Sequence, residues 1–136
     1  ATGAIAQGAL VAHRLGKPFV YVRSSAKDHG LANLIEGYLE QGSKVMVVED
    51  LISTGGSSLK AVEALRNAGS EVVGMVASFT YGFPVATEAF EKANVQLETL
   101  TDYQSMLNAA LQSGYIKEDS LDTLNEWRKN PSEWGK

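Results

Sequence analysis

The fold is decided by the stretch Lys44-Val45-Met46-Val47-Val48-Glu49-Asp50-Leu51-Ile52-Ser53-Thr54-Gly55-Gly56-Ser57-Ser58. Its four consecutive apolar residues, Val45 to Val48, are typical of a strand that is covered on both faces, as in a parallel sheet. Two carboxylates, Glu49 and Asp50, stand where this strand should end, and a turn of small residues follows them. Because ligands of open α/β folds bind beyond the carboxyl ends of the strands, we expect residues 50–57 to face a ligand.

Strands and helices are predicted on both sides of this stretch. Apolar, β-branched and aromatic patterns predict further strands over residues 18–23, 34–39, 71–79 and 95–100. Helical spacing of apolar residues predicts helices over residues 5–15, 57–68, 84–94, 103–112 and 117–129, and all of them except 84–94 are followed by a glycine or proline that can end them. Strand, helix and strand in succession from residue 44 form a right-handed βαβ crossover. The predicted fold class is therefore α/β, with a mainly parallel central sheet flanked by helices.

Two local contacts are expected as well. Ser57 or Ser58 can cap the first amides of the helix over residues 57–68. Trp127 and Trp134 are expected to pack the C-terminal tail onto the body of the domain.

Composition and charge narrow the class of protein. The chain of 136 residues is long enough for one domain with a substantial core. Its 12 basic and 16 acidic residues give a net charge of −4 without a basic block, so a nucleic-acid partner is not expected. The lack of cysteine excludes disulfides and thiolate metal sites and fits a reducing compartment. Since neither a membrane-spanning apolar run nor a signal peptide is visible, we expect a cytoplasmic protein with no membrane partner.

A second polar stretch follows the predicted strand over residues 18–23. It has no hydrophobic periodicity, and it carries Arg23, Lys27 and His29 within seven positions. Such a loop can close over an anionic ligand and exclude water. It can equally be an ordinary polar connection. The small residues of the stretch 1–8 also allow two interpretations. They can let the backbone approach an anion at the start of a helix, or they can let that helix pack closely on the sheet.

The chemistry of the central stretch points toward a phosphorylated sugar. A carboxylate such as Asp50 can accept hydrogen bonds from vicinal sugar hydroxyls, while the amides and hydroxyls of a turn cradle a phosphate at a helix N-terminus. Neither GxxxxGK[ST] nor GxGxxG occurs in the chain, so an ATPase or a dinucleotide enzyme is not expected. The simpler alternative is that Glu-Asp ends a strand and Gly-Gly makes a turn. On the residues alone both interpretations stand.

Residues 45–57 resemble the signature of the type I phosphoribosyltransferases, enzymes that use 5-phosphoribosyl 1-pyrophosphate (PRPP): four apolar residues, two acids, two apolar residues and a Ser/Thr/Gly loop. Residues 23–30 and 33–37 resemble the mobile loop of the orotate phosphoribosyltransferase branch of this family, and residues 1–9 are similar to its early pyrophosphate-side loop and helix. The resemblance spans residues 1–79 in the order of the family. It implies a Rossmann-like type I phosphoribosyltransferase core over residues 1–136. The family's N-terminal hood, which covers the base, is expected to be missing because the chain begins inside a motif.

The resemblance also implies a role for each matching residue. Glu49 and Asp50 would hold the ribose hydroxyls of PRPP, and Asp50 would also assist charge development on the sugar. The remaining residues that would bind PRPP within the signature are Leu51, Ile52, Ser53, Thr54, Gly55, Gly56 and Ser57. Those from Ser53 to Ser57 would bind the 5′-phosphate, and Ser53 would also touch orotate.

The loop residues Arg23, Lys27 and His29 would bind the departing pyrophosphate, so the catalytic residues implied are Lys27, His29 and Asp50. The implied cofactor is Mg²⁺, carried mainly by PRPP, with no dedicated metal ligands in the protein. Because this family delivers the loop bearing Lys27 and His29 into the neighbouring subunit, a homodimer with shared active sites is implied.

The implied reaction transfers ribose 5-phosphate from PRPP to orotate, giving orotidine 5′-phosphate and pyrophosphate in de novo UMP biosynthesis. The alternatives are a purine or other type I phosphoribosyltransferase, or a non-catalytic PRPP-binding regulatory domain. The loop pattern and the acidic net charge favour the orotate enzyme. Three positions depart from the family's pattern: many relatives have lysine in place of Ser24, and some have arginine in place of Thr80 or Tyr81.

Overall fold

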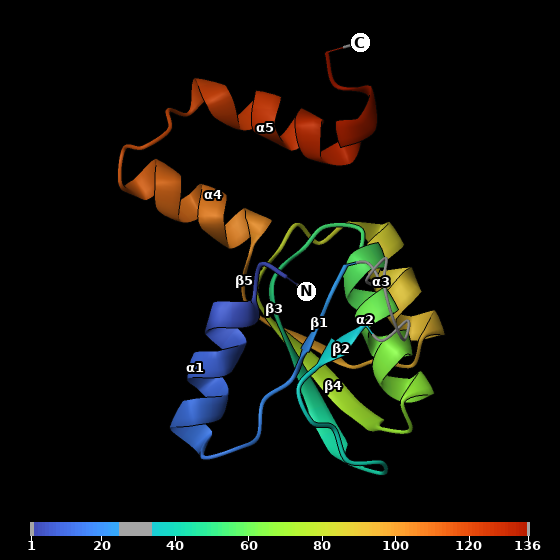
Figure 1. The fold of residues 1–136 in the computed structure, drawn as a ribbon. Coiled ribbons are helices and arrows are strands. Elements are labelled where there is room, and N and C mark those ends of the chain that lie inside the picture. The colour runs from blue at the N-terminus through green and yellow to red at the C-terminus, as the bar shows by residue number, and fades with distance from the viewer. Residues whose placement is uncertain (1, 25–33, 136) are drawn as a thin grey trace.

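The computed structural model describes residues 2–24 and 34–135 (Figure 1). Its central sheet has three parallel strands in the order β3-β4-β5. Their bounds are Lys44–Ile52 for β3, Glu71–Thr80 for β4 and Leu97–Asp102 for β5. Two helices connect them, α2 over Gly56–Asn67 and α3 over Pro84–Lys92. The predicted α/β class with a parallel sheet is confirmed.

The helices cover the sheet from two sides. Figure 1 shows α2 and α3 together on one face and α1, over Ile5–Leu15, on the other. The main core lies on the side of α2 and α3, where Val62, Met75 and Phe90 are almost completely buried. This arrangement leaves the ends of the strands at the upper edge of the sheet free to carry a site.

The side of the sheet that faces α1 is packed less fully. A cavity of about 690 Å³ is lined mainly by α1, residues 17–22 and β3. Met46 on β3 is 52% exposed as a result, while Val47 is buried. The expectation that Val45 to Val48 are covered on both faces is therefore met only in part, because α1 does not close over the whole face.

A short ribbon stands beside the main sheet. Its strands β1, over Tyr21–Val22, and β2, over Ile35–Glu36, pair antiparallel with Val22 opposite Ile35. Both are shorter than the predicted strands over residues 18–23 and 34–39. The loop between them includes Lys27 and His29, which lie outside the described residues.

Two C-terminal helices follow β5, α4 over Tyr103–Gln112 and α5 over Asp119–Lys129, and a short 3₁₀ turn spans Pro131–Glu133. Asp102 caps α4, because its Oδ1 accepts a hydrogen bond of 2.8 Å from the Ser105 N–H. Figure 1 shows both helices above the upper edge of the sheet. Of the two tryptophans expected to hold this tail, Trp127 does so through ring contacts. Trp134 is 49% exposed and makes no ring contact with the described residues.

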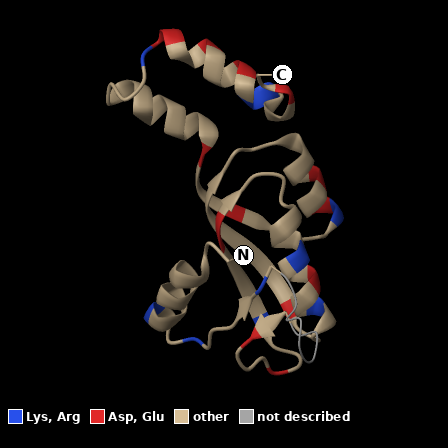
Figure 2. Cartoon of the chain, turned by 45° about the horizontal axis from the view of Figure 1, so that its top comes forward, with Lys and Arg blue, Asp and Glu red and all other residues tan. Residues whose placement is uncertain are grey.

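Charged residues are spread over the surface. In Figure 2 acidic and basic residues are interspersed on the helices, and the residues drawn form no continuous basic face on the side in view. None of the helices in the described ranges is both long and apolar enough to cross a membrane.

Candidate active site

The two carboxylates of the signature occupy the end of β3 in different surroundings. Side chains of a strand alternate between its faces, so neighbouring residues meet different partners. Glu49 is only 4% exposed, and its Oε2 accepts a hydrogen bond of 3.2 Å from the Ser58 hydroxyl on α2. Asp50 is half-buried, and its Oδ1 accepts a hydrogen bond of 2.8 Å from the Leu51 N–H. One acid is thus anchored inside the fold and the other is open to a ligand.

These surroundings move the two pKa values apart. Burial raises the pKa of Glu49, and its hydrogen bond with Asp50 raises it further. Burial also raises the pKa of Asp50. The hydrogen bond with Glu49 and those from backbone N–H groups outweigh it, so the pKa of Asp50 falls below its ordinary value. Asp50 is therefore the carboxylate that stays ionised most readily, which suits it to accept hydroxyl hydrogen bonds and to face positive charge.

The N-terminal segment packs directly against this acid. A Cβ placed on Gly3 would overlap the Asp50 carboxylate, with the Asp50 Cγ only 2.8 Å away. Farther along, a Cβ on Gly8 would lie 2.9 Å from Cε2 of Phe19. Both glycines therefore serve close packing, one of the two interpretations that the sequence left open. Gly3 is a site residue that the sequence did not single out, since nothing in its spacing pairs it with Asp50.

The loop from Ser53 to Ser57 leads from the carboxylates into α2. Gly55 precedes the helix with a φ of 80°, and a Cβ at this position would lie 2.7 Å from Cε2 of Phe90. Only glycine fits such a position, because L side chains rarely adopt a positive φ. The loop residues Ser53, Thr54, Gly56 and Ser57 are exposed. The loop therefore presents polar groups to solvent from a tightly seated turn.

The N-terminus of α2 has no side-chain cap. The expectation that Ser57 or Ser58 caps it is wrong, because the helix already begins at Gly56 and the Ser58 hydroxyl donates to Glu49 instead. First-turn amides without a side-chain partner, next to exposed hydroxyls and at the positive end of the helix dipole, form a suitable site for an anion such as phosphate.

Arg23 directly follows strand β1. Its N–H donates to the Leu34 carbonyl at 2.8 Å, and its Nη1 lies 3.5 Å from Oε1 of Glu36 on β2. The ribbon therefore orients this arginine before any ligand binds. The other two loop residues of the prediction, Lys27 and His29, lie outside the described residues.

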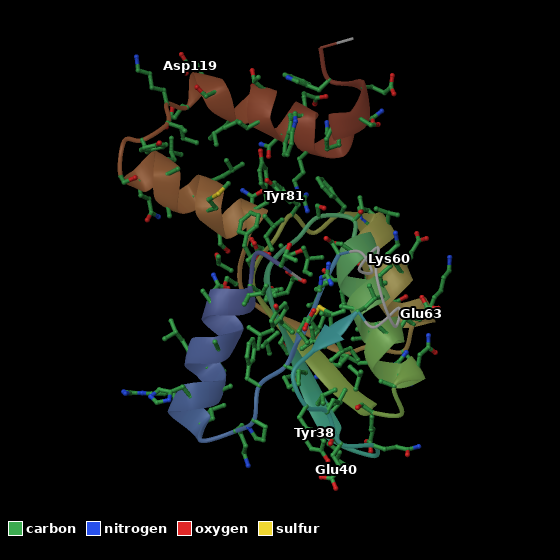
Figure 3. All side chains as sticks on the ribbon, viewed as in Figure 1. Tyr38, Glu40, Lys60, Glu63, Tyr81 and Asp119 are labelled. Atoms are coloured by element: carbon green, nitrogen blue, oxygen red, sulfur yellow. The ribbon has the colours of Figure 1, made fainter. Side chains whose placement is uncertain are left out.

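The loop that follows β4 borders the site as well. The Tyr81 N–H donates to the Ile52 carbonyl at 3.0 Å, so this loop is attached to the residue just before Ser53. Figure 3 shows Tyr81 between the upper edge of the sheet and the C-terminal helices. The sequence marked Thr80 and Tyr81 only as departures from a family pattern, and their attachment to the end of β3 was not predicted.

Metal ligands are few. The described residues contain no group of three or more His, Cys, Asp or Glu side chains that could hold a metal ion.

Comparison with known proteins agrees with this geometry. Residues 1–95 match the family described as the phosphoribosyl transferase domain. A protein of Bacteroides thetaiotaomicron named orotate phosphoribosyltransferase is 68% identical over 134 residues, which are 98% of this chain and 63% of that protein. The chain thus spans less than two thirds of the length of this curated relative.

Two solved structures show how far the likeness extends. The crystal structure of orotate phosphoribosyltransferase from Aeropyrum pernix has a TM-score of 0.74 at 32% identity, over 86% of this chain and 63% of that one. Adenine phosphoribosyltransferase from Leishmania tarentolae has a TM-score of 0.58 at 26% identity, over 71% of this chain and 56% of that one. The family match covers more than half of the chain and includes both the carboxylate pair and the loop from Ser53 to Ser57, which we call the phosphate-type loop. The chain therefore belongs to the phosphoribosyl transferase domain family.

Proposed function

We propose that the protein is an orotate phosphoribosyltransferase, which transfers ribose 5-phosphate from PRPP to orotate and releases pyrophosphate, in de novo UMP biosynthesis. One observation carries the proposal: Asp50, whose pKa is lowered, lies at the end of β3, two residues before the loop that leads into the uncapped N-terminus of α2. A sugar phosphate needs both parts, an acceptor for its hydroxyls and a cradle for its phosphate. The choice of orotate as the base follows the name of the relative that is 68% identical.

The loop and the carboxylates divide the binding of PRPP between them. The amides at the start of α2 and the hydroxyls of Ser53, Thr54 and Ser57 would hold the 5′-phosphate. Asp50 would accept hydrogen bonds from the ribose hydroxyls, and Glu49, anchored by Ser58, would keep the end of β3 in place. Of the remaining signature residues, Leu51 and Ile52 would line this contact through their backbone, and Ser53 would also reach orotate.

The reaction then develops charge in two places. The bond between C1 of the ribose and pyrophosphate breaks with its electron pair on the leaving oxygen, and a ring nitrogen of orotate forms the new bond to C1 and loses its proton. Positive charge on the ribose in the transition state faces the ionised Asp50, which stabilises it because the acid is already in position. Arg23, Lys27 and His29 are proposed to bind the pyrophosphate that leaves, with the loop excluding water.

Mg²⁺ is proposed as the cofactor. It prefers oxygen ligands and is commonly held by one or two carboxylates together with substrate phosphates. The carboxylate of Asp50 and the lack of a larger cluster among the described residues fit an ion that arrives with PRPP. When bound, Mg²⁺ would neutralise charge on the leaving pyrophosphate.

The wider context is part of the same proposal. Residues 1–136 would form the phosphoribosyltransferase core. The active form would be a cytoplasmic homodimer in which each subunit lends its Lys27 and His29 to the other. Nucleic acid and membrane are not proposed as partners.

A purine phosphoribosyltransferase is the second candidate, because the adenine enzyme of Leishmania tarentolae shares the fold. A direct test supplies the full-length protein with Mg²⁺ and PRPP and follows the consumption of orotate, hypoxanthine and adenine in parallel. Formation of orotidine 5′-phosphate alone is the expected result. Conversion of a purine with orotate untouched would assign the second candidate, and PRPP binding without any transfer would indicate a regulatory domain.

A further inference from the structure

Helix α5 is held to the body of the domain by residues near its end. None of its residues, Asp119–Lys129, is fully buried. Its main contacts come from Trp127, whose ring lies 5.7 Å from that of Tyr81 and 5.6 Å from that of Tyr103, measured between centroids. Both partners belong to the upper edge of the sheet, one just after β4 and the other just after β5. The helix is therefore docked next to the candidate active site.

Arg128 extends this docking to the backbone. Its Nε donates to the Tyr81 carbonyl at 2.9 Å and its Nη2 donates to the Gly82 carbonyl at 3.0 Å. A planar guanidinium can satisfy two successive carbonyls at once, which an ammonium group cannot do with the same geometry. Gly82 has a φ of 64°, and a Cβ there would lie 2.9 Å from Nη2 of the arginine. The loop is thus shaped to receive this one side chain.

The same loop is attached to the phosphate-type loop from its other side. The Tyr81 N–H donates to the Ile52 carbonyl at 3.0 Å, and the Gly82 N–H donates to the Thr80 hydroxyl at 3.0 Å. Ile52 directly precedes Ser53, where the phosphate-type loop begins. A continuous chain of hydrogen bonds therefore runs from α5 through residues 80–82 to the start of the phosphate-type loop.

We propose that Arg128 is a positioning residue for the phosphate-type loop, acting through the backbone of residues 80–82. The inference rests on the proposed function, in that the ligand of this loop is taken to be PRPP. Without the guanidinium, two carbonyls lose their donors and the bond between Tyr81 and Ile52 opens more often. The loop then spends less time in its binding conformation, and the apparent affinity for PRPP falls by that fraction.

The test compares Arg128→Gln and Arg128→Lys with Lys129→Gln in the full-length protein. Lys129 is the matched control, since it is the next cation on the same helix and pairs with Glu126 rather than with the loop. In Arg128→Gln, the dissociation constant and the KM for PRPP should rise about tenfold while kcat stays within about twofold. Arg128→Lys should restore part of the affinity, and Lys129→Gln should leave it unchanged.

A purely structural role would give a different pattern, because loss of folded enzyme lowers kcat and leaves KM unchanged. That pattern, or an unchanged KM in Arg128→Gln, would overturn the inference. Hydrogen exchange of the Tyr81 amide gives a readout without substrate and should be faster in Arg128→Gln than in Lys129→Gln. Equal exchange rates of the Tyr81 amide in the two variants would also overturn the inference.

The wild-type protein separates the two proposals. If it binds PRPP but leaves orotate untouched, the proposed reaction is wrong while the effect of Arg128 on PRPP affinity is still measured. If it does not bind PRPP at all, both proposals fail together.

Discussion

The ends of β3 and β4 lie side by side at the upper edge of the sheet, yet they are built in opposite ways. The polar groups at the end of β3 are local: Glu49, Asp50 and the loop up to Ser57 follow one another in the chain, and Ser58, the hydrogen-bond partner of Glu49, is nine residues away from it. The end of β4 is aromatic and distant: Tyr81 is held by Arg128, 47 residues away. The first end carries the chemistry and the second fixes its position. A signature in the sequence can show the first kind of structure only.

The strongest way to test this division is Asp50→Asn, which keeps the shape and removes the charge. If Asp50 faces the positive charge of the transition state, kcat should fall by about 10²- to 10³-fold, as when one preorganised electrostatic group is lost. Steady-state formation of orotidine 5′-phosphate measures it.

Glu63→Gln on the exposed surface of α2 is the matched control, and it should leave kcat unchanged. A loss of less than about threefold in Asp50→Asn would be too small for transition-state stabilisation of this kind and would remove Asp50 from the chemistry.

The tight turn at the end of β3 predicts a difference between two neighbouring glycines. Gly55→Ala forces a Cβ into a positive φ and to within 2.7 Å of Phe90, so unfolding should become easier by about 2 kcal/mol. Gly56→Ala meets only the Thr54 hydroxyl at 4.0 Å and adds helix propensity, so its stability should be equal or higher. Urea denaturation of both variants measures the difference. Equal losses would mean that the turn is not shaped around Gly55.

At the end of β4, the two tryptophans of the tail provide a similar comparison. Trp127→Ala removes ring contacts with Tyr81, Phe83 and Tyr103. Because each aromatic pair contributes about 0.5 kcal/mol or more to stability, the free energy of unfolding should fall by about 1.5 kcal/mol. Trp134→Ala should cost less than about 0.5 kcal/mol, as for an exposed position. Limited proteolysis after residue 115 would report the release of α5. Equal sensitivity of both variants would contradict the assigned docking.

Interactions between residues close together in the chain could be predicted from the sequence, and interactions between distant residues could not. The run from Val45 to Val48 and the two acids predicted a buried strand with a site at its end, because hydrophobic period and polarity are local signals. The cap of α2 was mispredicted, since nothing local shows that the Ser58 hydroxyl is taken by Glu49. The contacts of Gly3 with Asp50 and of Arg128 with Tyr81 were not predicted, because they join residues far apart in the chain and no single-sequence pattern encodes such pairs.

The smallest predicted effect separates the two neighbouring acids by pH. The pKa of Glu49 is raised in the folded protein above its ordinary value of 4.5, so ionisation of this buried acid weakens the fold as pH rises from that value. Glu49→Gln keeps an acceptor for the Ser58 hydroxyl and removes the ionisation. Its stability relative to the wild type should therefore be lowest near pH 4 and increase toward pH 7.

Asp50→Asn should show the opposite trend. Folding lowers the pKa of Asp50, so the stability that its ionised form contributes is present above the ordinary pKa and lost as pH falls. Thermal unfolding measures the two slopes, for Glu49→Gln between pH 4 and 7 and for Asp50→Asn between about pH 2 and 5, because the pKa of Asp50 lies below its ordinary value of 3.8. If relative stability changed with pH in the same direction for both variants, the two acids would share one environment. Asp50 would then not be distinguished from Glu49 as the charged partner of the ribose.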